Sequence, residues 1–174
     1  MVISFHKNIS ASLKSIHLQQ HQEFLVHSQE SKRTHLTSDD LIALYGNHKW
    51  AVVDILNQEY SHLLENPFDL YNWLNYKEHD EIAYFLNEAG SNALSHSEFL
   101  VPYKFHLWLG KKGFIIGIEQ KGKSFNAEEV NPKRIKDNEG AAFEFYRNCK
   151  STVFFDNPQE ARIVFMEYLL PSHF

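Results

Sequence analysis

The chain has 174 residues, of which 43% are hydrophobic and 14% aromatic, so it can bury the core of one folded domain. Its net charge of −5 at pH 7 is not that of a nucleic-acid-binding protein, which is usually basic. Because Cys149 is the single cysteine, no intrachain disulfide can form, and we expect a reducing compartment. Cys149 itself is expected to be an unreactive residue that packs in the core. Since no apolar run could span a membrane and the N-terminus lacks a secretory pattern, we expect a cytoplasmic protein without a membrane partner.

The first 36 residues carry few regular signals. The stretches "VISF" (2–5) and "EFLVHS" (23–28) are candidate short strands. His17 and His21 have the i, i+4 spacing of a metal pair on a helix, but no third ligand lies near them in the sequence. Surface histidines are therefore the better interpretation.

Helical signals follow in the middle of the chain. The stretch "TSDD" from Thr37 places capping side chains ahead of an apolar run, and Gly46 is typical of a helix end, which predicts one short helix. Apolar residues from Trp50 to Leu64 recur mostly at spacings of three and four, so a second helix is expected there, ending before Pro67. A further helix should run from about Glu78 to Ser95, with its apolar residues on one stripe.

The period then changes from helix to strand. The alternating stretch "VPYKFHLWL" (101–109), the turn "LGKKG" and the returning stretch "FIIGIEQ" (114–120) predict a β-hairpin. The polar segment from Lys121 to Asn138 contains Pro132 and many charges, which favours a loop or lid rather than a helix. A helix over 139–149 and two last strands, in "STVFFD" and "EARIVFMEYLL", complete the chain.

These amphipathic helices need one shared apolar surface, and a sheet supplies it. We therefore expect an α/β two-layer sandwich, in which a mixed, mainly antiparallel sheet carries the helices near residues 50–64, 78–96 and 139–149 on one face. Residues 49–174 are predicted to form the main domain, and residues 1–48 an N-terminal extension.

The stretch "GIEQKGKS", from Gly117 to Ser124, matches the G-x-x-x-x-G-K-[ST] pattern of a phosphate-binding P-loop. A P-loop joins a strand of a parallel sheet to the N-terminus of a helix. Here the preceding strand pairs in a hairpin, and the following residues are polar and include Pro132. The 50 residues after Ser124 are also too few for the remaining parallel strands, so we reject the P-loop.

A different resemblance involves the predicted helix before the hairpin. Glu88, Asn92 and His96 recur at spacings of four and so form one row beside the apolar stripe. The stretch "NEAGSNALSH" resembles the N-box of the GHKL (histidine kinase-like) ATPase superfamily, especially of its stand-alone anti-sigma-factor serine kinases. The resemblance implies that Glu88 is the catalytic base, that Asn92 is a ligand of the Mg²⁺ bridging the ATP phosphates, and that His96 belongs to the nucleotide site.

The order of elements downstream is also similar to that superfamily, which has a hairpin, a D-x-G-x-G-F motif, a lid, a G-x-G turn into a helix and two closing strands. The stretch "QKGKSF" falls at the first motif and "NEGAAFEF" at the second. The resemblance covers about residues 50–170 and implies the GHKL/Bergerat ATP-binding fold. It assigns further nucleotide contacts to Gln120, Gly122, Ser124 and Gly140.

Gln120 replaces the family's adenine-binding aspartate, and Ser124 and Asn138 replace two of the four motif glycines. The resemblance implies a cytosolic regulator that binds ATP and Mg²⁺ and a protein partner, and that acts as an anti-sigma-type serine kinase or switch protein. The departures leave a second hypothesis open, namely a pseudo-ATPase that keeps the fold as a protein-interaction module. Whether the chain is an enzyme, and whether it forms a homodimer, also stays open.

Overall fold

The computed structural model describes residues 3–25, 38–71, 81–96, 104–120, 123–137 and 141–171. Their elements, in chain order, are β1 (Ile3–Ser4), α1 (Ile9–Ser15), β2 (Leu18–Leu25), α2 (Ser38–Tyr60), α3 (Glu81–His96), β3 (Lys104–Gly110), β4 (Gly113–Glu119), α4 (Ala127–Asp137), α5 (Ala141–Asn148), β5 (Thr152–Phe155) and β6 (Ile163–Leu169). The predicted hairpin is therefore present as β3 and β4, and the two predicted last strands are present as β5 and β6.

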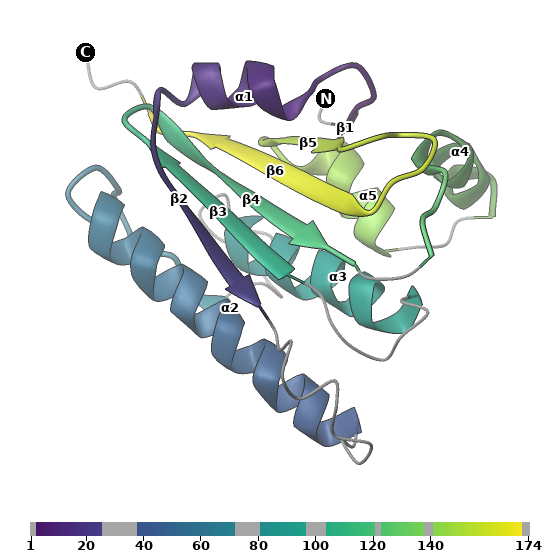
Figure 1. Cartoon of the computed structure of the whole chain (residues 1–174), viewed down its shortest axis with the longest axis horizontal. Coiled ribbons are helices and arrows are strands. Elements are labelled where there is room, and N and C mark those ends of the chain that lie inside the picture. Colours follow the sequence, from purple (N-terminus) through teal and green to yellow (C-terminus); the bar gives the residue numbers. More distant parts are fainter. Residues whose placement is uncertain are drawn as a thin grey trace.

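The strands form one six-stranded sheet in the order β1-β5-β6-β4-β3-β2 (Figure 1). β1 pairs with β5 in parallel, and the other neighbouring strands pair antiparallel. The prediction of an α/β fold with a mixed, mainly antiparallel sheet is confirmed. The N-terminal residues supply both edge strands, β1 and β2, and α1 between them.

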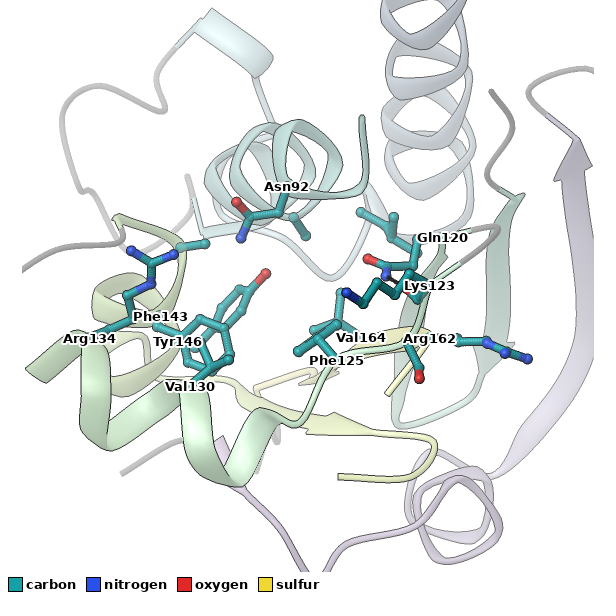
Figure 2. A pocket seen from close by; sticks show the side chains of 14 residues that line it. Asn92, Gln120, Lys123, Phe125, Val130, Arg134, Phe143, Tyr146, Arg162 and Val164 are labelled. Carbon is teal, nitrogen blue, oxygen red and sulfur yellow. Dashed lines mark hydrogen bonds between the residues drawn. The ribbon is translucent and has the colours of Figure 1, made fainter. Parts of the chain in front are cut away.

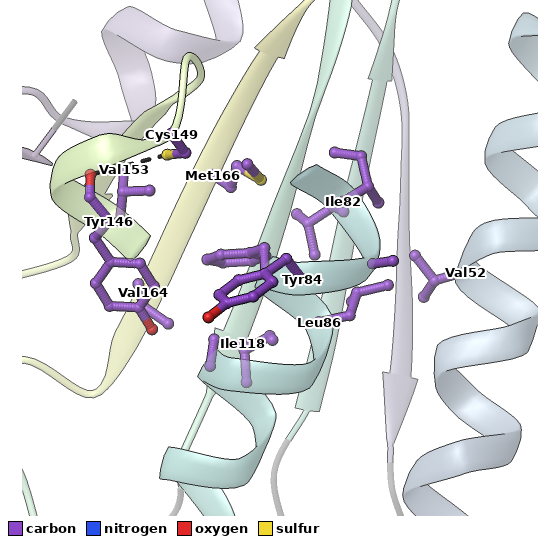
Figure 3. Packing of buried hydrophobic residues seen from close by; sticks show 14 of the residues in the cluster. Val52, Ile82, Tyr84, Leu86, Ile118, Tyr146, Cys149, Val153, Val164 and Met166 are labelled. Atoms are coloured by element: carbon purple, nitrogen blue, oxygen red, sulfur yellow. Dashed lines mark hydrogen bonds between the residues drawn. The ribbon is translucent and has the colours of Figure 1, made fainter. Parts of the chain in front are cut away.

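Three helices, α2, α3 and α5, cover one face of the sheet, as predicted (Figure 1). Alternate side chains of the strands point to this face, where Phe105 and Leu107 of β3 and Ile116 of β4 are fully buried. They pack with apolar side chains of the helices, such as Val52 of α2 and Leu86 of α3, in one large core (Figure 3). This core joins the helices to the sheet and forms the base of the cavity described below.

The short helix α1 lies on the opposite face of the sheet (Figure 1) and was not predicted from the sequence. Ile16, which ends α1, is fully buried in a second cluster with Trp108 of β3 and Phe165 of β6. The carboxylate of Glu167 in β6 accepts hydrogen bonds from Lys7 Nζ at 2.6 Å and from the hydroxyl of Ser12. These contacts join α1 to residues far away in the sequence, so no local sequence pattern could predict this helix.

Helix α2 is continuous through Gly46, so the prediction of a helix end at that residue was wrong. A Cβ built at Gly46 meets nothing within 4 Å, which places this glycine against open space rather than at a tight turn. Glycine inside a helix costs only about 1 kcal/mol relative to alanine. Burial of Val52, Val53 and Leu56 in the core outweighs that cost.

The segment predicted as a loop or lid contains the helix α4, so the expectation that no helix follows the "GKS" motif was wrong. Asn126 caps this helix, since its side-chain oxygen accepts from Glu129 N at 3.2 Å. The first residue, Ala127, is fully buried and donates its backbone N–H to Pro158 O at 2.7 Å. These contacts at the start of α4 offset the backbone hydrogen bond that Pro132 cannot donate.

Candidate functional site

A cavity of about 310 Å³ lies between α3, α4 and α5 and the adjoining ends of β4 and β6 (Figure 2). Its apolar lining comes from Ala89, Ile118, Phe125, Val130, Ala142, Phe143 and Val164. Its polar lining comes from Asn92, Gln120, Ser124 and the hydroxyl-bearing Tyr146, together with three cationic residues. A concave, mainly apolar wall with a few polar groups is the usual form of a small-molecule site.

Three of the residues singled out from the sequence meet in this cavity, namely Asn92, Gln120 and Ser124. Asn92 extends from α3, and Gln120 and Ser124 lie on either side of the segment that leaves β4. In Figure 2, Asn92 and Gln120 point into the same space from different walls. Residues 28 positions apart in sequence are thus brought together by the packing of α3 on the sheet.

Glu88 stands one helical turn before Asn92 on α3 and is half-buried, but among the described residues it is not part of the cavity lining. Its burial raises the pKa of its carboxyl group above the ordinary value. His96 is the last residue of α3, and its side chain lies outside what the structure describes. Gly122 and Gly140 also lie outside the described residues.

The side chain of Gln120 has a defined orientation although it is neutral. It is 6% exposed, and its Nε2 donates a hydrogen bond to the backbone oxygen of Lys123. Its backbone N–H donates to Arg162 O at 2.8 Å, which fixes the end of β4 against β6. Because a backbone carbonyl can only accept, Nε2 must face Lys123, and the oxygen Oε1 faces the cavity (Figure 2).

The cationic residues of the lining are Lys123, Arg134 of α4 and Arg162, which precedes β6. In Figure 2 the guanidinium of Arg162 points away from the cavity, so Lys123 and Arg134 supply its positive charge. No aspartate or glutamate of the described chain belongs to the lining, so the cavity favours an anionic ligand. Arg162 was not a candidate from the sequence. Arg134 belongs to a basic cluster after Gln120 that is visible in the sequence, but only the folding of α4 directs it to this cavity.

One wall of the cavity is aromatic. The rings of Phe143 and Tyr146, both in α5, have centroids 5.3 Å apart. Burial, with a smaller contribution from the charge of Glu88, raises the pKa of Tyr146, so its hydroxyl stays protonated. Arg147 of α5 donates from Nη1 to the side-chain oxygen of Asn131 in α4 at 2.8 Å, which ties the two helices at this wall.

Comparison of the chain with protein-family models and with curated proteins finds no match. Across the described ranges, no helix has both the length and the apolar character needed to cross a membrane. Within the same ranges, no three histidine, cysteine, aspartate or glutamate side chains gather as a metal site.

Proposed function

We propose that this cavity binds ATP and that the protein is a histidine kinase-like regulator of the anti-sigma serine kinase or switch type. The observation that carries the proposal is the meeting of Asn92 and Gln120 in one cavity. These residues come from the two separate segments that resemble the N-box and the adenine-side motif of the superfamily. A chance match of either motif would not require that they share a pocket.

The donors and acceptors of the lining suit an adenine nucleotide. Oε1 of Gln120 can accept from an amino group on a flat base, and the apolar residues beside it, such as Ile118 and Val164, can contact the faces of that base. In the view of Figure 2, Arg134 lies on the side of Asn92, away from Gln120. A nucleotide with its base at Gln120 would thus direct its phosphates toward one cation and one amide oxygen.

The volume of about 310 Å³ falls at the lower end of the range for ligand sites, roughly 300–1,000 Å³. It holds the base and sugar, and the phosphates then extend toward Asn92. Mg²⁺, when bound, would neutralise charge on the phosphates, and the side-chain oxygen of Asn92 is the oxygen ligand that the lining offers on that side of the cavity.

A second candidate, the pseudo-ATPase interaction module, is favoured by the position of Glu88. Among the described residues of α3, Ala89 and Asn92 line the cavity and Glu88 does not. A catalytic base must reach the proton that it removes, directly or through one water. With Glu88 outside the cavity, the protein would keep the fold as a protein-interaction module that no longer binds or turns over ATP.

The test is thermal unfolding and titration calorimetry with ATP and Mg²⁺. A ligand at one hundred times its dissociation constant adds about 2.7 kcal/mol to the free energy of unfolding. For a chain of this length each 1 kcal/mol shifts Tm by about 2–4 °C, so we expect a rise of about 5–10 °C. Asn92→Asp should reduce the part of this shift that depends on Mg²⁺, because it places a negative charge beside the phosphates.

The matched control is Asn47→Asp, which makes the same change at an exposed position of α2 and should leave the shift intact. Glu88→Ala should spare ATP binding and abolish any turnover, since a base acts mainly in the transition state. If neither ATP nor ADP at millimolar concentration raises Tm, the ATP-site proposal is wrong and the pseudo-ATPase takes its place.

A further inference from the structure

The aromatic wall of the cavity carries the hydroxyl of Tyr146. Tyr146 lies in α5 and is only 2% exposed. Figure 2 shows its hydroxyl directed into the cavity, on the side of Asn92. The Cys149 thiol donates to the backbone oxygen of Tyr146 at 3.8 Å, but within the part of the chain that the structure describes the side-chain hydroxyl has no hydrogen-bond partner. A buried polar group thus faces the ligand space without a partner in the protein.

The position of this hydroxyl is fixed by the packing of its ring. The ring centroids of Phe85 in α3 and of Phe145 in α5 both lie 6.1 Å from that of Tyr146, and that of Phe143 lies 5.3 Å away. The ring is part of the main core, where side chains interdigitate and keep their rotamers (Figure 3). Rotation of the ring about its own axis leaves the hydroxyl oxygen in place. The hydroxyl therefore cannot turn away when a ligand enters.

A hydroxyl in this position imposes a requirement on the ligand. Before a ligand binds, water can form hydrogen bonds with it. A ligand that displaces this water without replacing its hydrogen bonds loses affinity. Burial raises the pKa of Tyr146, so the hydroxyl stays protonated and can donate as well as accept. A ligand that fits the cavity therefore needs a polar group opposite Tyr146.

The place of Tyr146 along the cavity indicates which part of a nucleotide would meet it. This step rests on the proposed function, in which the base lies at Gln120 and the phosphates extend toward Asn92 and Arg134. In the view of Figure 2, the Tyr146 hydroxyl lies between Gln120 on one side and Arg134 on the other. The sugar is the part of a nucleotide between its base and its phosphates. A ribose hydroxyl both donates and accepts, as the hydroxyl of tyrosine does.

We propose that Tyr146 is a specificity-determining residue that selects ribonucleotides through a hydrogen bond to a hydroxyl group of the sugar. A nucleotide whose sugar lacks hydroxyls would leave the buried hydroxyl of Tyr146 without a partner. A site built to bond a ligand hydroxyl rejects the analogue that lacks it, because the buried group of the site is then left unpaired. Gln120 would select the base and Tyr146 the sugar.

The experiment is titration calorimetry of the full chain with ATP and with 2′,3′-dideoxy-ATP, both with Mg²⁺. The parent protein should bind ATP roughly 10-fold to 100-fold more tightly than the dideoxy analogue. In Tyr146→Phe the affinity for ATP should fall and that for the dideoxy analogue should rise, since neither partner is then left alone in an apolar contact. The preference should disappear. A merely structural role of Tyr146 would instead lower both affinities alike.

Two measurements guard against an effect of folding. Because no described residue bonds to the Tyr146 hydroxyl, ligand-free Tyr146→Phe should be as stable as the parent in urea unfolding. The matched control is Tyr168→Phe, which removes the same hydroxyl from a half-buried residue of β6 outside the cavity lining. This variant should keep the preference for ATP.

The outcomes separate this inference from the proposed function. If the parent binds ATP and the dideoxy analogue equally well, the ATP site stands and the role of Tyr146 is wrong. A preference for ATP that persists in Tyr146→Phe, or a parallel loss of both affinities, overturns that role as well. If ATP does not bind, the proposed function is wrong, and adenosine with 2′,3′-dideoxyadenosine tests the sugar contact without phosphates. Equal binding of these two, or none, overturns the inference too.

Discussion

The contact between α2 and α3 can be tested at a single glycine. Gly90 lies between Glu88 and Asn92 on α3, and a Cβ built on it would lie 1.5 Å from the hydroxyl oxygen of Tyr45 on α2. Tyr45 is 4% exposed, and its ring is stacked on Phe105 at 5.3 Å between centroids. The ring therefore has little space into which it could move, and Gly90→Ala should force the two helices apart.

The magnitude follows from two opposing effects. Overpacking of a closely packed interior costs about 1–3 kcal/mol, and an overlap of this size with a confined ring belongs at the upper end. Alanine regains about 1 kcal/mol of helix propensity over glycine. We therefore expect Gly90→Ala to lower the free energy of unfolding by about 2 kcal/mol, which corresponds to about 4–8 °C in Tm.

The assay is urea and thermal unfolding of matched variants. Gly46→Ala makes the same substitution inside α2, where nothing lies within 4 Å of the new Cβ, and should stabilise by about 1 kcal/mol. In a Tyr45→Leu background the clash is absent, so Gly90→Ala should become neutral or stabilising. A Gly90→Ala protein at least as stable as the parent would refute the reasoning, and with it the close approach that places α3 beside the cavity.

Three further predictions concern the buried side chains of Tyr60 and Cys149. Tyr60→Phe should lower the free energy of unfolding, measured in urea, by about 1–3 kcal/mol. The reason is that the Tyr60 hydroxyl donates to Gly110 O at 3.0 Å and accepts from Gly110 N at 3.1 Å. Tyr71→Phe is the control and should leave stability unchanged, because Tyr71 is 75% exposed. Burial raises the pKa of Tyr60 to about 12, so its stabilising effect should be complete below pH 10 and disappear as the pH rises to 12, a loss that Tyr60→Phe should not show. Burial also raises the pKa of the Cys149 thiol to about 12. A thiol reagent in native buffer should therefore modify Cys149 only at the rate at which the protein unfolds around it. Rapid labelling of the folded protein would contradict this.

The elements with strong periodicity could be predicted from the sequence. Alternation over 101–109 and 114–120 indicates the hairpin, and three-and-four spacing indicates the helices that became the later part of α2, α3 and α5. Asn92 and Gln120 also became site candidates from local motifs alone. The spacing of apolar residues predicts an element correctly when one side of that element is buried. In this protein most elements bury one side in the main core between the sheet and its helices.

The departures from prediction share one physical cause. Gly46 and Pro132 are local signals against a helix, worth about 1 and 3 kcal/mol. Helix α2 continues through Gly46 because the core covers its apolar side, and α4 continues through Pro132 because contacts with Asn126 and Pro158 hold its first turn. The expectation that His17 and His21 are surface histidines is confirmed, since both are exposed, His17 in a turn with a φ of 53° and His21 on strand β2.

The partner of His21 is His106, 85 residues away, and only strand pairing brings them together. The same holds for the cavity, where Arg134 joins Asn92 only after α4 packs beside α5. The sequence by itself therefore determined the type of most elements and the apolar side of each. The tertiary structure decided which polar side chains meet, because pairing across a sheet depends on register and packing that no local pattern records.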